Sequence, residues 1–332
     1  MLGSKAPLVS VLLPVYNGAA YVADGIKSIL AQSYEHFELI IIDDGSRDDS
    51  AKIVEQFTDA RIHAYRQANL GLAATLNRGI QLARGKYLAR QDQDDLSLPS
   101  RFQRQVEFLE THEECGMVGT WAEIRSTDKT APKLHSHPSD SLALKFDLLF
   151  DNPFVHSSMM IRKTVFERVG VYSTDKARQP PEDYELWSRV ARDFEVANIP
   201  EVLHIYRDVP SSMSKGTVNP FLEHVIQISV ENFSLLTGRE KDDPVINNLV
   251  ALSHAAYHKV SGRPNLPDLT LALSQAAEEL CRKCNSPPSA LCAKVQWRRD
   301  NLKHHFLQWK KQAGMIRKFK EFVRGISRGV VR

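Results

Sequence analysis

The chain has 332 residues, of which 42% are hydrophobic and 25% charged, enough for one large domain and a smaller second one. No segment approaches the ~20 uninterrupted apolar residues of a membrane span, and residues 1–7 lack the apolar core of a secretion signal. The formal net charge is only +3, and we expect a cytoplasmic protein with no specific nucleic-acid partner.

Strand-like and helix-like segments alternate along the first part of the chain. Short apolar runs predict strands at residues 8–15, 37–42, 61–66, 86–91 and 115–124. Residues 22–30 have the spacing of an amphipathic helix, and another is predicted from about Pro99 onward. Ser46 and Asp49 match a capping box, which predicts a helix directly after the second strand. This alternation favours an α/β fold with a mainly parallel sheet.

Three polar clusters follow strands of this predicted sheet, at residues 14–17, 43–46 and 92–95. In open sheets of this kind, ligands bind beyond the carboxyl ends of the strands. Each cluster alone is equally consistent with an ordinary turn, because turns use the same residue types. Three of them at one edge of a sheet indicate a binding site.

The third cluster places three carboxylates in four residues, at Asp92, Asp94 and Asp95. Carboxylates so close together repel one another unless a cation lies among them. Oxygen ligands favour Mg²⁺ or Mn²⁺, which complete their shells with water and substrate phosphates. The cluster therefore suggests a phosphate-bearing substrate held through a metal, with an acidic turn before the next helix as the alternative.

Glu182 and Asp183 follow two prolines and begin another predicted helix, whose buried side includes Leu186 and Val190. Acidic residues at a helix start interact favourably with the helix dipole, so a purely structural role is one interpretation. The other is that the helix fixes a reactive carboxylate at its first turn. The two interpretations are compatible.

Beyond about residue 214 strand-like runs stop and long helical patterns follow, with breaks near Pro264 and at residues 286–288. Cys281, Cys284 and Cys292 lie in a helical pattern that does not meet the spacings of structural zinc sites. With four cysteines in all, the chain fits a reducing compartment better than a disulfide framework.

The last 39 residues are strongly basic. Residues 294–332 contain twelve Lys and Arg against two acids, a net charge of +10, which leaves −7 on residues 1–293. Between 314 and 330 the apolar residues recur at helical spacing, as in helices that lie on anionic membranes. Packing on the protein or in an oligomer, and nonspecific binding of nucleic acid, are the alternatives.

Taken together, the motifs resemble the inverting family-2 glycosyltransferases with the GT-A fold, over roughly residues 7–208. The resemblance is carried by residues 11–17, 42–48, 69–71, 85–87, 92–95 with Pro99, and 182–187. It implies a Rossmann-like mixed sheet flanked by helices, followed by a C-terminal helical region. The expected domains are 1–214 for catalysis, divided into a donor half (1–124) and an acceptor half (125–214), and 215–332 for the helical region with its basic tail.

The resemblance also implies roles for individual residues. Asp94 and Asp92 are the expected ligands of Mn²⁺ or Mg²⁺, and Asp183 is the expected catalytic base. The donor is expected to contact Pro14, Tyr16, Asn17, Asp44, Asn69, Asp92 and Asp95. His204 and Arg207 follow a strand-like run and are predicted to reach the diphosphate, although a histidine at a strand end is often only an ordinary polar residue.

The expected reaction is a single displacement that moves a hexosyl or N-acetylhexosaminyl group from a UDP-sugar to a hydroxyl of a saccharide or lipid-linked saccharide. Its expected setting is bacterial surface polysaccharide assembly, such as O-antigen, lipopolysaccharide or capsule, on the inner face of the membrane. The Gln-x-x-Arg-Trp motif of processive synthases is not present, which favours addition of one or a few sugars. A non-catalytic sugar-binding module and a sugar nucleotidyltransferase are the alternatives.

Overall fold

The computed structural model describes residues 8–126, 130–209 and 221–329. The chain divides into two compact units, Met1–His224 and Val225–Arg332. The boundary expected at residue 214 lies among residues 210–220, outside the described part.

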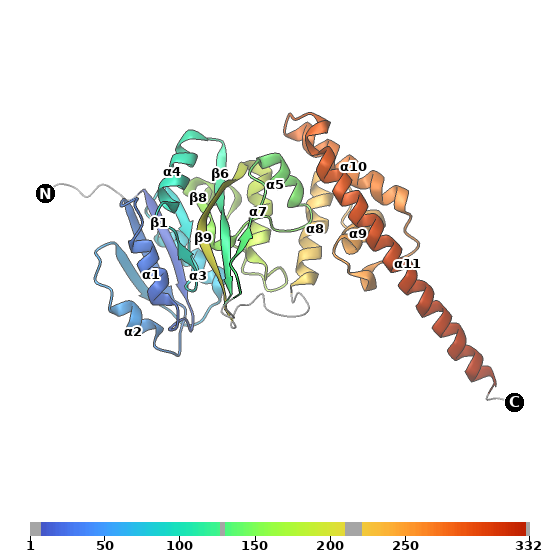
Figure 1. Ribbon diagram of the computed structural model, residues 1–332, viewed down its shortest axis with the longest axis horizontal. Coiled ribbons are helices and arrows are strands. Elements are labelled where there is room, and N and C mark those ends of the chain that lie inside the picture. Colours follow the sequence, from blue (N-terminus) through green and yellow to red (C-terminus); the bar gives the residue numbers. More distant parts are fainter. Residues whose placement is uncertain (1–7, 127–129, 210–220, 330–332) are drawn as a thin grey trace. The chain divides into compact units, whose positions relative to one another are not determined.

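The described residues of the first unit form a mixed sheet in the order β3-β2-β1-β4-β8-β6-β9-β5, with β7 paired to β6 (Figure 1). Strands β1 (Val9–Val15), β2 (Phe37–Asp43), β3 (Ile62–Arg66) and β4 (Tyr87–Arg90) pair in parallel. The remaining strands are β5 (Leu96–Ser97), β6 (Cys115–Ser126), β7 (Lys133–His135), β8 (Met160–Arg162) and β9 (Glu195–Asp208); β6 and β9 pair in parallel, and the other pairs among them and with β4 are antiparallel. All five strands expected from apolar runs are therefore confirmed.

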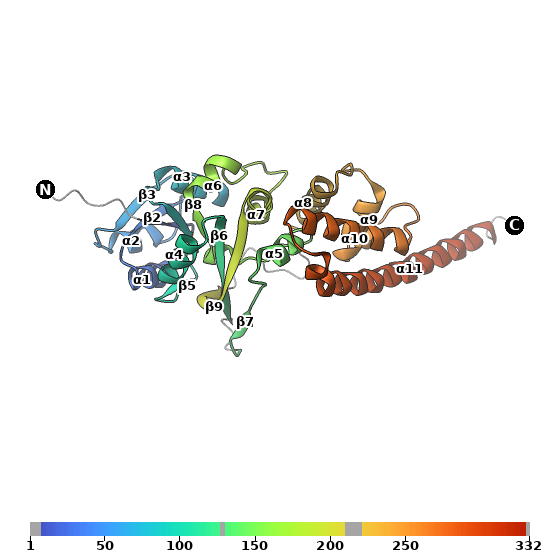
Figure 2. The same ribbon diagram turned by 90° about the horizontal axis from the view of Figure 1, so that it is seen from above.

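Helices cover both faces of this sheet, with α3 and α6 on one side and α1 and α4 on the other (Figure 2). Their bounds are α1 (Val22–Leu30), α2 (Ser50–Glu55), α3 (Leu72–Leu82), α4 (Arg101–Thr111), α5 (Ser141–Asp147), α6 (Lys163–Val169) and α7 (Glu182–Asp193), with a short 3₁₀ helix η1 (His156–Ser158). Val11 and Leu13 of β1 pack with Ile26 of α1 and Phe102 of α4 in a buried core. This core fixes the strand ends that carry the polar clusters.

The capping box expected at Ser46 and Asp49 is wrong. Helix α2 begins only at Ser50, and no side-chain hydrogen bond caps it. The Ser46 hydroxyl instead accepts the backbone N–H of Asn17 at 3.0 Å, and Asp48 accepts that of Ala19 at 3.0 Å. The polar side chains of this loop are used to join the ends of β1 and β2 rather than to start a helix.

The described residues of the second unit are helical. They form α8 (Leu222–Thr237), α9 (Pro244–Ser253), η2 (Tyr257–Lys259), α10 (Leu266–Lys283), η3 (Pro288–Leu291) and α11 (Cys292–Gly329). Helix α10 ends before Pro287 and begins after Pro264, as expected. Among the described residues, none of these helices is both long enough and apolar enough to cross a bilayer. The side chains of residues 316–332 lie outside the described part, so the two faces of the basic tail stay a prediction.

Candidate active site

The three polar clusters meet at one edge of the sheet because β1 pairs with β2 on one side and with β4 on the other. The amide of Gln93 accepts the backbone N–H of Tyr16 at 2.9 Å and donates to its carbonyl at 3.1 Å. On the other side, the Asn17 side-chain oxygen accepts the backbone N–H of Arg47 at 2.9 Å. The loops after the three strands therefore form one continuous surface.

The first part of this surface is organised around Asp44, which is buried. Its carboxylate accepts the side-chain amide of Gln67 at 2.7 Å and the backbone N–H groups of Leu70 and Gly71, both at 2.9 Å. A carboxylate has about four acceptor positions, so one remains for a ligand N–H. Asn69 lies in the loop held by these bonds and is exposed, as is Tyr16 at 45%. Residues expected to contact the donor are thus brought together here.

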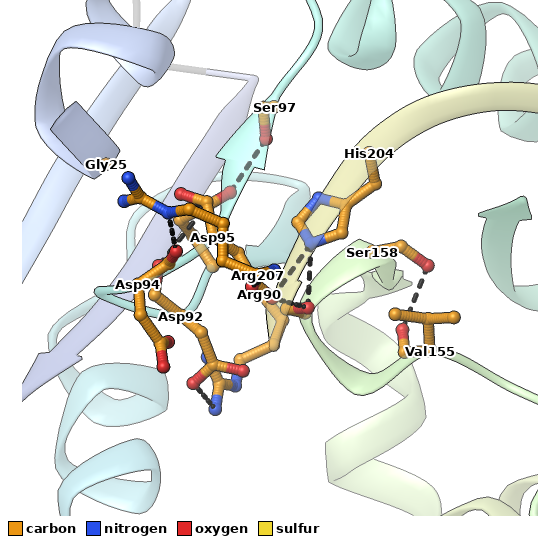
Figure 3. A network of polar contacts seen from close by, with 12 residues as sticks. Gly25, Arg90, Asp92, Asp94, Asp95, Ser97, Val155, Ser158, His204 and Arg207 are labelled. Atoms are coloured by element: carbon orange, nitrogen blue, oxygen red, sulfur yellow. Dashed lines mark hydrogen bonds and ion pairs between the residues drawn. The ribbon is translucent and has the colours of Figure 1, made fainter. Parts of the chain in front are cut away.

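In the acidic loop after β4, residues 92–95, two of the carboxylates are costly to ionise. Burial, together with the charges of Asp92 and Asp95, raises the pKa of Asp94 to about 7. Burial and the charge of Asp95 also raise the pKa of Asp92, although Asp92 forms an ion pair with Arg90 at 2.6 Å. Figure 3 shows Asp92 turned toward Arg90, with Asp94 beside it.

These carboxylates fit a divalent cation, because Mn²⁺ and Mg²⁺ prefer hard oxygen ligands and a cation would offset the cost of ionising Asp92 and Asp94. Among the described residues, however, no group of three or more His, Cys, Asp or Glu side chains is placed to hold a metal by itself. A cation bound to Asp94 and Asp92 must therefore obtain other ligands from water or from a substrate phosphate.

The third acid, Asp95, is only 1% exposed and has a supporting role. It accepts the hydroxyl of Ser157 at 2.5 Å and the backbone N–H of Arg207 at 2.9 Å, and it lies 3.1 Å from the ring nitrogen Nε2 of His204. The Arg207 guanidinium donates to the carbonyl of Asp94 and to Asp24. Both His204 and Arg207 therefore support the acidic loop through contacts with Asp94 and Asp95.

This arrangement corrects the sequence prediction that His204 reaches a diphosphate. The His204 side chain is 0% exposed and faces Asp95, as Figure 3 shows, so it has no path to a ligand in this conformation. Burial also lowers its pKa, which favours the neutral ring. Arg207 is part-buried, and its guanidinium is used in bonds to the Asp94 carbonyl and to Asp24.

Asp183 lies in the first turn of α7, two residues after Pro181, as expected. Its carboxylate accepts the side-chain amide of Asn152 at 2.7 Å and the backbone N–H of Tyr184 at 2.7 Å. Burial and the charge of Glu182 raise the pKa of Asp183 to about 7. A carboxylate whose pKa lies near the working pH can both take up and release a proton, which is what a general base requires.

Comparison with known proteins shows which family this chain belongs to. Residues 10–170 match the family model described as glycosyl transferase family 2. EpsE of Bacillus subtilis (strain 168), described as a glycosyltransferase, is 32% identical over 232 residues, which cover 68% of this chain and 82% of EpsE. The chain belongs to glycosyl transferase family 2. The family that the sequence motifs resemble is thereby confirmed.

One further relative and two solved structures are also similar to this glycosyltransferase. The teichuronic acid biosynthesis glycosyltransferase TuaG of B. subtilis is 32% identical over 63% of this chain and 82% of TuaG. S. aureus TarS in complex with UDP-GlcNAc superposes with a TM-score of 0.60 at 16% identity, over 92% of this chain and 91% of that chain. A mannosyltransferase of Pyrobaculum calidifontis, solved with GDP-Man and Mn²⁺, gives 0.53 at 17%, over 92% and 87%. These structures confirm the expected GT-A fold.

The glycosyltransferase has a buried cation that the sequence analysis missed. Arg90, at the end of β4, is 3% exposed, and its charge lowers the pKa values of Asp92, Asp94 and Asp183. It therefore influences both acidic motifs. The signal in the sequence is a charged residue at the end of an otherwise apolar strand, two positions before Asp92.

Proposed function

We propose that the enzyme is an inverting, metal-dependent transferase of hexosyl or N-acetylhexosaminyl groups from a nucleotide diphosphate donor, with Asp183 as the base. The observation that carries this proposal is the presence of two acidic groups from different elements, Asp92 with Asp94 and Glu182 with Asp183, which both interact with Arg90. Both Asp94 and Asp183 have a pKa of about 7. One group suits a cation with a diphosphate, and the other suits proton transfer.

In the proposed reaction the acceptor hydroxyl attacks the anomeric carbon as the bond to the diphosphate breaks. Asp183 takes the hydroxyl proton during the attack, and the nucleoside diphosphate leaves with the bonding electron pair. The attack comes from the face opposite the leaving group, so the anomeric configuration is inverted. A bound Mn²⁺ or Mg²⁺, held by Asp94 and Asp92, would act as a Lewis acid that stabilises the charge on the diphosphate.

The donor is proposed to be a UDP-sugar bound across Pro14, Tyr16, Asn17, Asp44 and Asn69. The remaining acceptor position of Asp44 suits the ring N–H of uracil. The TarS complex with UDP-GlcNAc supports this choice, while the mannosyltransferase complex with GDP-Man makes a GDP-sugar the alternative to exclude.

A panel of nucleotide sugars tests this assignment directly. With Mn²⁺ present, we expect slow hydrolysis of one or more UDP-sugars, inhibition by UDP, and loss of turnover when EDTA removes the metal. Hydrolysis of GDP-sugars alone would overturn the UDP assignment. Release of pyrophosphate from a nucleoside triphosphate and a sugar phosphate would instead identify a nucleotidyltransferase, and donor binding without turnover of any acceptor would identify a binding module.

The proposed setting is bacterial surface polysaccharide biosynthesis, which is supported by the similarity to TuaG, a glycosyltransferase of teichuronic acid biosynthesis. The acceptor would then be a saccharide or a lipid-linked saccharide, bound mainly by residues 125–214, while residues 1–124 bind the donor. Specificity among sugar epimers depends on modest energy differences between loop contacts. The acceptor therefore has to be identified by assay.

The basic tail is proposed to hold the enzyme on an anionic membrane surface, where a lipid-linked acceptor would lie. Its net charge of +10 in residues 294–332 supports this, since each Lys or Arg near such a surface contributes about 1 kcal/mol. Deleting residues 314–332, which removes six Lys or Arg, should reduce cosedimentation with vesicles containing phosphatidylglycerol but not with neutral vesicles. Unchanged cosedimentation would contradict the proposal.

A further inference from the structure

Asn152 lies in a short series of hydrogen bonds that ends on Asp183. Its side-chain nitrogen donates to Oδ2 of Asp183 at 2.7 Å, and its side-chain oxygen accepts the backbone N–H of Phe154 at 3.1 Å. Because a backbone N–H can only donate, the bond to Phe154 fixes which end of the amide is the oxygen. The NH₂ end must then face Asp183. Asn152 is thus oriented as a donor to this carboxylate before any substrate binds.

The segment that contains Asn152 is itself anchored to the acidic loop. Five residues further on, the Ser157 hydroxyl donates to Asp95 at 2.5 Å. The next hydroxyl, that of Ser158, donates to the carbonyl of Val155 at 2.9 Å, as Figure 3 shows. Residues 152–158 therefore run from the proposed base at one end to the proposed metal loop at the other. A side chain on this segment can hold Asp183 at a fixed place relative to the donor.

Other groups near Asp183 also affect how readily its carboxylate ionises. On its own helix Glu182 raises the pKa of Asp183, and on β4 Arg90 lowers it. On η1, His156 places Nδ1 at 4.0 Å from Asp183 and 3.9 Å from Glu182, beyond hydrogen-bond distance, and burial keeps its pKa well below the usual value. Near neutral pH the His156 ring therefore brings no positive charge to the pair.

We propose that Asn152 is a positioning residue for the base: its amide aims the Asp183 carboxylate toward the acceptor and favours the ionised form. A hydrogen bond donated to an ionised group stabilises that form and directs its free lone pairs away from the donor. This inference rests on the proposed role of Asp183 as the base. It adds a group that the proposed chemistry does not otherwise use.

Replacing Asn152 by alanine should lower kcat by roughly tenfold to a hundredfold near pH 7, the range expected for losing one hydrogen bond to a charged group. The KM for the nucleotide donor should change little, because the donor-side residues keep their contacts. Without the amide donor the carboxylate is harder to ionise, so the acidic limb of the kcat/KM profile should move to higher pH. The loss should therefore be largest at low pH and smaller at pH 9.

A matched control is available in the second unit. Asn248 makes the same kind of two-ended contact, donating to the carbonyl of Ser261 at 3.1 Å and accepting its N–H at 2.9 Å. Asn248→Ala removes two amide hydrogen bonds and should lower the Tm, but the pH profile should stay as in the wild type. A fall in kcat for Asn152→Ala that is equal at every pH would overturn the inference.

Asn152→Asp serves as a second variant if the alanine variant does not fold. It keeps the oxygen that accepts from Phe154 and replaces the donor by a second negative charge, so the acidic limb should move further than in Asn152→Ala. In an Asp183→Asn background, neither substitution at Asn152 should reduce the residual rate any further. Full activity of Asp183→Asn would overturn the proposed function itself. An inactive Asp183→Asn with wild-type profiles for both Asn152 variants would overturn the present inference alone.

Discussion

Replacing Asp183 by asparagine is expected to reduce sugar transfer by roughly 10²- to 10⁴-fold, the usual contribution of a general base. Asparagine has nearly the same shape but cannot take up the proton of the acceptor hydroxyl. The backbone N–H of Tyr184 can still donate to the side-chain oxygen at position 183, so the start of α7 should keep its structure, while the new NH₂ group faces the amide of Asn152 and lowers the Tm. Binding of UDP and Mn²⁺, which depends on the other acidic motif, should stay close to wild type.

The measurements are the transfer rate and, by calorimetry, the affinity for UDP in the presence of Mn²⁺. A suitable control is Asp193→Asn at the other end of the same helix, where the exposed carboxylate pairs with Arg168 at 3.1 Å. This variant should be fully active. Turnover by Asp183→Asn equal to that of the control would contradict the assignment of the base.

The pH dependence of the wild-type enzyme follows from the same residue. Its pKa of about 7 lies above the ordinary value of 3.8 for an aspartate, so the base is protonated over much of the acidic range. Activity should therefore rise with pH through about 7 and level off above it. Asp183→Asn removes the group that titrates, and its residual rate should lose this acidic limb.

The parts of the fold that could be predicted are those with local sequence signals. Strands β1 and β2 are mainly apolar runs, and their parallel pairing places the polar clusters at residues 14–17 and 43–46 at one edge. The helix start at Glu182 follows from the two preceding prolines. For these elements the pattern within about ten residues contains the necessary information.

The features that the sequence mispredicted or did not indicate depend on distant partners. Ser46 has a capping-box partner nearby in sequence, but its hydroxyl accepts the backbone N–H of Asn17, 29 positions away. His204 is drawn under the acidic loop by Asp95, which is 109 positions away. The role proposed for Asn152 depends on a contact across 31 positions. No local pattern indicates such pairs, because the sheet order that creates them is set by the whole domain.

Replacing Asp94 by asparagine should have two opposite effects, a large loss of transfer and a gain in stability. The amide binds a divalent cation poorly, and losing the several kcal/mol that a Lewis acid supplies corresponds to a fall in kcat of roughly 10²- to 10³-fold. Calorimetry should show that added Mn²⁺ no longer increases the affinity for UDP. An undiminished response to Mn²⁺ would contradict the assignment of Asp94 as a metal ligand.

The gain in stability follows from the sign of the pKa shift. Burial and neighbouring acids raise the pKa of Asp94 from 3.8 to about 7, so between these pH values the folded protein binds more protons than the unfolded chain. The free energy of unfolding therefore decreases as the pH rises from about 4 to about 7, and the cost is fully present at pH 8. Asp94→Asn removes this cost, so with EDTA present its Tm should exceed that of the wild type at pH 8 and approach it at pH 4.

Asp95→Asn is the matched control, because it makes the same change one residue further on. Asp95 accepts hydrogen bonds from Ser157 and Arg207, so its replacement places an NH₂ group against one of these donors. Its Tm should fall at both pH values. If both variants lowered the Tm at pH 8, the acidic loop would not store the electrostatic repulsion that we infer. Opposite signs for two adjacent aspartates would show that one of them is placed for a ligand and the other for the fold.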